Sequence, residues 1–199
     1  HTLAEGHHAW APFSRMAGTF EWDFIEAPSQ MLEEWAWNAD ILQRFATNDS
    51  GEPIPAELVE RLRAGRDLCE GLLTARQLSL ATQAYRLHRD HPEDVAGAVE
   101  KIEREFDVRE RLAGTHAYAS FGHLSGYQAN YYTYQWSLSI AKDLFTAFDP
   151  EDMRAADVVR RYRDEVLSPG LSRPAASSIE AFLGRPGSTD AYQEWLDSL

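Results

Sequence analysis

Near its start the chain reads TLAEGHHAW, and the side chains here that could do chemistry are a glutamate and two histidines. Glu5 and His8 are three residues apart, so on a helix they share one face, while His7 points about 100° away from His8. Zinc peptidases use the helical pattern H-E-x-x-H, in which two histidines hold the metal and the glutamate acts as general base. Ala4 stands where the first histidine of that pattern would be. On these residues alone, an ordinary solvated helix is the favoured interpretation.

A second set of polar aromatic side chains lies in GHLSGYQANYYTYQW. Tyr127, Tyr131 and Tyr134 are four and three residues apart, which predicts three phenols along one face of a helix. A buried tyrosine hydroxyl needs a partner, so a purely apolar core would more naturally use Leu or Phe. His123 precedes Tyr127 by four residues and lies between two glycines. Such a histidine could polarise a carbonyl oxygen or hold a peptide backbone, and a core helix with a polar edge is an equally good interpretation.

The elements that must position these side chains are helices. Almost every segment has helical spacing, and no run alternates as a strand does. We expect helices over 1–11, from about 22 to 46 with Pro28 kinking or starting it, and over 56–89 as one long or two abutting helices. Further helices are predicted over 91–106, 126–148, 149–167 with Asp149 as N-cap and Pro150 at N1, and 176–184 and 188–196. Gly184 is expected to cap the first of these last two. The sequence therefore predicts an all-α fold with residues 1–199 as a single domain.

Composition excludes several classes of partner. The chain has 199 residues, of which 32 are Asp or Glu and 19 are Lys or Arg, for a net charge of −13. No basic stripe is available to neutralise phosphates, so nucleic acid is not expected as a partner. No apolar run approaches the roughly 20 residues that span a bilayer, and the first residues lack the pattern of a secretory signal. The single Cys69 rules out an internal disulfide and a cysteine-rich zinc site. We expect a cytoplasmic protein that does not bind membranes.

Three segments together resemble the thimet-oligopeptidase-like zinc peptidases, a family that includes oligopeptidase A and the peptidyl-dipeptidases. GTFEWDFIEAPSQMLEEW is similar to the family's Gly-Thr … Asp-Phe-Val-Glu-x-Pro-Ser-Gln stretch. SFGHLSGYQANYYTYQW is similar to its Phe-Gly-His … Gly-Tyr … Tyr-Tyr-x-Tyr-x-Trp stretch, and YRDEVLSPGLSRPAASSIEAFLGRP to its C-terminal tail. The likeness runs in order from about Leu3 to the end of the chain. It implies an all-α fold whose active site lies in a deep channel that admits short peptides.

The resemblance also implies a zinc site. Glu26 matches the family's third zinc ligand, His8 its second ligand and Glu5 its general base. Ala4 removes the first ligand, and a catalytic zinc usually has three protein ligands. Two alternatives for the missing ligand stay open: His7 would reach the metal if the helix were distorted, or Glu5 would become a ligand itself. The second choice gives a Glu-x-x-His pair on one helical face, as in carboxylate-rich metal sites of helical bundles.

On the substrate side, the resemblance implies that His123, Tyr127 and Tyr134 contact the substrate and stabilise the tetrahedral intermediate. Tyr131 and His116 are further candidates for substrate binding. The chain departs from the family pattern in other ways too. The link between His8 and the glycine at 18 is shorter, one glycine is missing in HLSGY, and only the C-terminal part of a family member is covered.

Two functions from different classes follow. One is a zinc metallopeptidase domain that hydrolyses short peptides with metal-activated water, with Glu5 as base and His123, Tyr127 and Tyr134 on the oxyanion side. The other is a non-hydrolytic relative that has lost the metal and binds a peptide or another small ligand. In either case, part of the channel wall would have to come from a second copy of the chain or from a partner chain.

Overall fold

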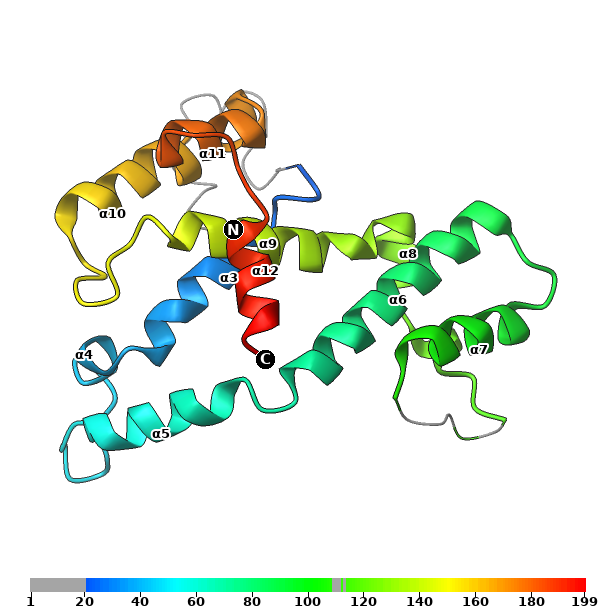
Figure 1. The fold of residues 1–199 in the computed structure, drawn as a ribbon, viewed down its shortest axis with the longest axis horizontal. Helices are drawn as coiled ribbons and strands as arrows, with labels where there is room; N and C mark the ends of the chain where they lie inside the picture. The colour runs from blue at the N-terminus through cyan, green and yellow to red at the C-terminus, as the bar shows by residue number, and fades with distance from the viewer. Residues whose placement is uncertain (1–20, 109–111, 113) are drawn as a thin grey trace. The chain divides into compact units, whose positions relative to one another are not determined.

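A computed structural model describes residues 21–108, 112 and 114–199, and this part of the chain is built from helices (Figure 1). The α-helices are α3 (Ala27–Leu32), α4 (Ala39–Leu42), α5 (Ala56–Arg66), α6 (Glu70–Asp90), α7 (Val95–Phe106), α8 (His123–Gly126), α9 (Thr133–Phe145), α10 (Ala156–Tyr162), α11 (Ala175–Leu183) and α12 (Asp190–Asp197). Short 3-10 segments are η1 (Glu33–Trp37), η2 (Ala117–Ser120), η3 (Gln128–Tyr132) and η5 (Gly170–Ser172), and η4 (Arg163–Leu167) is a π-helix. Within the described residues, β pairing is limited to one isolated bridge between Thr47 and Pro53. The all-α prediction is confirmed.

The chain divides into two compact units. The first unit contains the described residues up to Leu68 together with Ser137–Leu199, and the second unit contains Cys69–Trp136. Helix α9 therefore begins in the second unit and continues into the first. Organisation as one domain over 1–199 stays a prediction.

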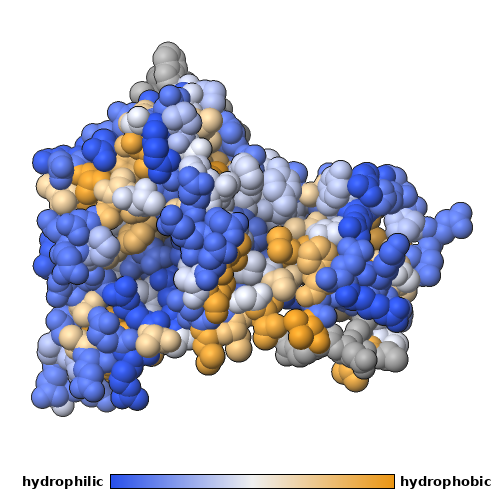
Figure 2. Space-filling model, viewed as in Figure 1, coloured by the Kyte–Doolittle hydropathy of each residue, from blue (hydrophilic) through white to orange (hydrophobic). Residues whose placement is uncertain are grey.

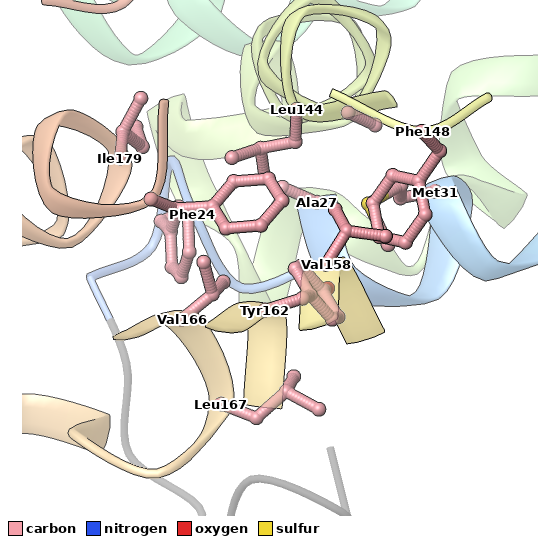
Figure 3. Close-up of a cluster of buried hydrophobic side chains, with 12 residues drawn as sticks. Phe24, Ala27, Met31, Leu144, Phe148, Val158, Tyr162, Val166, Leu167 and Ile179 are labelled. Carbon is pink, nitrogen blue, oxygen red and sulfur yellow. The ribbon is translucent and has the colours of Figure 1, made fainter. Parts of the chain in front are cut away.

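The first unit has an apolar core formed by α3, α9, α10, η4, α11 and the turn after α9. Its aromatic and aliphatic side chains point toward one another (Figure 3). Phe148 contacts both Tyr162 and Phe182, with ring centroids 5.9 Å apart in each case. Burial of side chains of this size, each worth roughly 1.5–3 kcal/mol, holds these short helices together. The buried members are Phe24, Ala27, Met31, Ala141, Leu144, Phe148, Val158, Tyr162, Val166, Leu167, Ile179 and Phe182.

The second unit is built around α6, which packs against α7 and η3. Its interior is more polar than that of the first unit, because α6 buries Thr74, Ser79 and Gln83. Gln83 satisfies part of its hydrogen-bonding need within its own helix, donating to the Ser79 hydroxyl at 3.2 Å. The aromatic segment with His123 and the three tyrosines belongs to this unit.

Several helix boundaries follow from local signals that the sequence displays. Pro28 lies in the first turn of α3, where its fixed φ suits a helix start and its missing N–H costs nothing. Asn38 and Asp94 cap α4 and α7 by accepting from the backbone N–H three residues ahead. Gly184 ends α11 in the left-handed region at φ 71°, as predicted.

The structure changes two of the predicted helices and decides between the alternatives for a third. The segment from 22 to 46 is not one helix but α3, η1 and α4, because Asn38 adopts an extended backbone conformation that ends η1 and caps the start of α4. The segment 56–89 is two helices, the second of the alternatives, separated by Cys69 at φ 68°. The prediction of Asp149 as a helix N-cap is wrong: its carboxylate accepts from the N–H of Glu151 at 2.9 Å and closes a turn, and α10 begins only at Ala156.

The predicted helix over 126–148 is also interrupted. Gln128 adopts φ 51°, so the segment runs as α8, η3 and α9 instead of one continuous helix. Residues in the left-handed region cannot continue a right-handed helix. The tyrosines therefore do not lie on one regular helical face, although they still meet around His123, as described below.

The visible surface is mostly hydrophilic, in keeping with the net charge of −13 (Figure 2). None of the helices in the described residues is long and apolar enough to cross a bilayer.

Candidate functional site

Glu26 immediately precedes α3, in the N-cap position, and is half-buried. The Ser29 hydroxyl donates to the backbone oxygen of Glu26 at 2.9 Å and lies 3.3 Å from its carboxylate Oε2. Hydrogen bonds to a carboxylate fix its rotamer, as they do for carboxylates that ligate metals. The short helix thus orients an acidic side chain at its start.

The segment that carries Glu26 is anchored on α9. The Ser137 hydroxyl donates to the backbone oxygen of Asp23 at 3.1 Å, and Ser137 is fully buried. Phe24, two residues before Glu26, and Ala27, directly after it, are 3% and 0% exposed. Because these two residues are packed in the core, the Glu26 backbone has little freedom, and its carboxylate is held in a defined position.

His123 is surrounded by aromatic rings of its own unit. Its ring centroid lies 4.9 Å from Tyr127, 5.0 Å from Tyr131 and 5.8 Å from Tyr134, all in edge-to-face arrangements. Tyr127 and Tyr134 stack on each other at 5.7 Å with an interplanar angle of 20°. Aromatic pairs in these geometries are worth about 0.5–1.5 kcal/mol each beyond their buried area. We call His123 with these three tyrosines the His123 cluster.

One hydrogen bond in the cluster joins two groups that can donate or accept. His123 Nε2 lies 3.2 Å from the Tyr134 hydroxyl, and which of them donates depends on the tautomer of the imidazole. When Nε2 carries the hydrogen, the Tyr134 hydroxyl can direct its own hydrogen to another acceptor. The pair is therefore suited to hydrogen-bonding a carbonyl oxygen, or the oxyanion that develops from it, with a donor held in advance.

Tyr131 is the buried member of the cluster, at 7% exposure, whereas Tyr127 and Tyr134 are half-buried. Burial raises the pKa of the Tyr131 phenol, and the nearby charge of Arg76 on α6 only partly offsets this. The phenol therefore stays protonated at neutral pH. Arg76 is itself paired with Asp107, at 3.5 Å between Nη1 and Oδ2.

The structure brings together some of the predicted site residues. His123, Tyr127, Tyr131 and Tyr134 meet within one unit, although on a broken helix. His116 is exposed, and its Nδ1 lies 3.2 Å from the Tyr118 hydroxyl. Phe121 also packs against the His123 cluster, which the sequence reasoning missed; its ring centroid lies 5.6 Å from that of His123 and 5.1 Å from that of Tyr131. Its position in the Phe-Gly-His motif was the available signal.

The first residues of the chain lie outside the described part, and with them Ala4, Glu5, His7 and His8. The proposed proximity of His8 and Glu26 is therefore untested and stays a prediction. Across residues 21–108, 112 and 114–199, no group of three His, Cys, Asp or Glu side chains could hold a metal ion. Glu26 supplies one suitable oxygen donor, which is not enough for a zinc site that uses three protein ligands. The described residues alone do not form one.

A model of peptidase family M3 matches residues 6–198, which include both the Glu26 segment and the His123 cluster. The chain belongs to peptidase family M3. This confirms the resemblance stated on the three sequence motifs. Several proteins named as oligopeptidases are similar over most of this chain. A thimet-like oligopeptidase of Dictyostelium discoideum is 32% identical over 188 residues, covering 90% of this chain and 28% of the relative.

Two further relatives give the same picture. Saccharolysin of Saccharomyces cerevisiae is 33% identical over 188 residues, covering 90% of this chain and 26% of its own length. Oligopeptidase A of Salmonella typhimurium is 29% identical over 184 residues, covering 87% of this chain and 26% of its own length. The chain thus spans about a quarter of the length of the curated relatives it matches.

Proposed function

We propose that this chain is a metallopeptidase-type domain that acts on short peptides and that the His123 cluster is its substrate-binding part. The family M3 match over nearly the whole chain carries the proposal, and the relatives named oligopeptidases support the substrate class. The family itself is one of metallopeptidase-type peptide hydrolases.

In this proposal, Tyr134 and Tyr127 donate hydrogen bonds to the peptide carbonyl oxygen, and His123 orients Tyr134 through the 3.2 Å contact. Removing one such donor from an oxyanion site typically costs about 10²–10³ in turnover. Tyr131, buried behind the imidazole, acts by packing against His123. His116 stays a predicted substrate contact.

Members of family M3 are zinc metallopeptidases, and a zinc ion, when bound, supplies Lewis-acid activation of water and of the substrate carbonyl. His8 and Glu26 would hold it here, with Glu5 or His7 as the third ligand in place of Ala4. If Glu5 keeps its free carboxylate, it serves as the general base. If Glu5 is a ligand, the domain lacks that base.

A second candidate function is favoured by a specific observation, the alanine at position 4. Loss of a ligand leaves a groove that still recognises peptides or another small ligand but does not hydrolyse them. This non-hydrolytic relative uses the same His123 cluster for binding alone. The two candidates differ in whether the chain holds metal.

Zinc titration by calorimetry distinguishes them, with the wild type compared with Ala4→His. The substitution adds an imidazole four residues before His8, and we expect zinc affinity to rise by about tenfold or more, because a third neutral ligand completes the set. Ala36→His, at an exposed position of η1, is the matched control and should leave zinc affinity unchanged. If neither the wild type nor Ala4→His binds zinc, the segment is not shaped for metal, and the non-hydrolytic function replaces the first. Equal, measurable binding by both would mean that Glu5 or His7 already supplies the third ligand.

A second copy or a partner chain would complete the groove. Exposed leucines at 58 and 62 on α5 offer apolar surface for such a contact, at 41% and 48% exposure. Light scattering after size-exclusion chromatography measures whether the purified chain self-associates.

A further inference from the structure

The second unit carries a pocket at the end of its α6–α7 hairpin, and none of its residues is among the candidate site residues above. Its volume is about 500 Å³, within the range of roughly 300–1,000 Å³ typical of small-molecule sites. It lies where α6 ends at Asp90 and α7 returns from Val95, so that the two helices run side by side (Figure 1). Pro92, in the connection between the two helices, is a further lining residue.

Part of the pocket lining is apolar. Leu87 of α6 lines it together with Ala98 and Ile102 of α7, which we call the floor, and Ile102 is only 2% exposed. Ala98 and Ile102 are four residues apart, so they lie on one face of α7. The floor can therefore accept an aliphatic group of modest size without displacing charged side chains.

Five further lining residues, which we call the rim, are charged and have an excess of positive groups. Arg86, Arg89 and Lys101 contribute three cations, and Asp90 and Glu105 contribute two anions. This local balance is opposite in sign to the net charge of −13 of the chain. A recess with an excess of cations attracts anions at contact distance, because salt screens the repulsion from the negative charges farther away on the surface.

Two of the cations are fixed by ion pairs. Arg86 Nη1 contacts both carboxylate oxygens of Glu105, at 3.0 and 2.9 Å, and Arg89 is paired with the adjacent Asp90. The hydrogen bond from Arg86, with the charges of Arg86 and Lys101, holds the pKa of Glu105 below its usual value. A guanidinium has five N–H donors, so each arginine keeps further donors for a ligand after these bonds are made.

Lys101 is the cation whose donors are least committed. Within residues 21–108, 112 and 114–199, it forms no ion pair within 4 Å, although its charge reaches Glu105. Lys101 is itself a lining residue, so its ammonium group is available to a ligand that occupies the pocket. A ligand carboxylate beside Lys101 would be flanked by Arg86 and would place an attached aliphatic group over Leu87 and Ile102.

We propose that this pocket binds a small carboxylate that carries a branched aliphatic side chain, such as the carboxyl end of a peptide or an acylated amino acid. The apolar floor selects the side chain, and the excess of cations on the rim selects the carboxylate. This inference does not rest on the proposed hydrolytic function. A free small acid and a peptide terminus share this chemistry, and the experiment below distinguishes them.

The test uses calorimetric titration of the 199-residue chain with N-acetyl-L-leucine. We expect saturable binding in the millimolar range or tighter that weakens as salt is added, since the contact is an ion pair. N-acetyl-L-leucinamide, which lacks the charge, should bind at least about tenfold more weakly. A pentapeptide of four alanines and a C-terminal leucine distinguishes a peptide end from a free acid. If it binds as tightly as N-acetyl-L-leucine or more tightly, the pocket is assigned to peptide ends, and if it binds more weakly, the pocket is assigned to free acids.

Lys101→Glu reverses the charge at the rim, and we expect it to weaken N-acetyl-L-leucine binding by about tenfold or more. The matched control is Arg104→Glu on the same helix, because Arg104 is 77% exposed, pairs with Glu100 and does not line the pocket. It should change affinity by less than about twofold. Circular dichroism of both variants verifies that α7 is intact. Equal weakening by the two variants, equal binding of the leucinamide, or no saturable binding of the acid to the wild type would each overturn the proposal.

Discussion

The buried carboxylate of Asp143 on α9 binds the C-terminal segment through Arg185, and removing Arg185 should destabilise the first unit strongly. Asp143 has a side chain that is 3% exposed. It accepts from Arg185 Nη1 at 3.2 Å, from Arg185 Nη2 at 2.5 Å and from the backbone N–H of Ser188 at 2.7 Å. The perturbation is Arg185→Leu, which leaves the carboxylate in place with only the Ser188 donor among these three.

The magnitude follows from what remains around the carboxylate. Removing one partner of a buried ion pair typically costs about 3–5 kcal/mol. Arg185 is 45% exposed, so water can enter where its guanidinium was, and Ser188 still donates. We therefore expect a loss of about 2–3 kcal/mol in the free energy of unfolding, below the usual range. For a chain of this length, that corresponds to a fall in Tm of about 4–12 °C.

Urea unfolding followed by tryptophan fluorescence measures the loss, with Arg63→Leu as the control. Arg63 and Glu60 form an exposed pair at 4.0 Å, so this variant should cost less than about 1 kcal/mol. In the double variant Asp143→Asn, Arg185→Leu, no charge is left buried, and a coupling of about 1–3 kcal/mol is expected. A loss for Arg185→Leu no larger than that for Arg63→Leu would refute the reasoning.

Two further predictions concern Glu34 and Cys69. Burial opposes the charged form of Glu34, but hydrogen bonds and charges from Arg66 and Lys142 outweigh it and hold the pKa of Glu34 below its ordinary 4.5. Because the pKa of Glu34 is lower in the folded chain than in the unfolded chain, its ionised form stabilises the fold above the unfolded-state pKa, and this stability is lost as pH falls through the folded-state pKa. Urea unfolding should therefore show the stability of the wild type falling below about pH 4.5, with a smaller loss in Glu34→Gln. Cys69 adopts φ 68°, a region that costs non-glycine residues roughly 1 kcal/mol, so Cys69→Gly should raise Tm slightly or leave it unchanged, and Cys69→Val should lower it by several degrees. A lower Tm for the glycine variant than for the valine variant would contradict the second prediction.

The ends of helices could be predicted from the sequence where a local signal and the tertiary structure agree. Pro28 at a helix start and Gly184 at a helix end both act through their own backbone preferences, which no distant contact overrides here. Asp149 shows the opposite case. A sequence of Asp followed by Pro suits a helix start, yet its side chain closes a turn with Glu151 instead. Both outcomes use the same hydrogen-bonding group, and the sequence alone does not distinguish them.

The His123 cluster could be predicted as a group of residues but not as a geometry. The spacing of Tyr127, Tyr131 and Tyr134 predicted one helical face, and the left-handed Gln128 breaks that helix. Non-glycine residues rarely adopt this conformation, and nothing in the local sequence indicates it. The rings meet because each packs on His123, and such packing depends on α6 and η3, which lie far apart in sequence. Contacts between distant segments of this kind are not visible in local periodicity.

Turnover of a short peptide by the wild type and by Tyr134→Phe, measured together with Tm, tests the proposed role of the His123 cluster most directly. The assay follows cleavage of an internally quenched peptide by the 199-residue chain with added zinc, and after chelation as a control. We expect zinc-dependent cleavage by the wild type and a loss of about 10²–10³ in turnover for Tyr134→Phe, because the variant lacks the hydroxyl beside His123 Nε2. Its Tm should stay within about 2 °C of the wild type, since the ring and its stacking on Tyr127 remain. Unchanged turnover with a lowered Tm would show that the tyrosine serves the core, and no cleavage by zinc-loaded wild type would contradict the hydrolytic function itself.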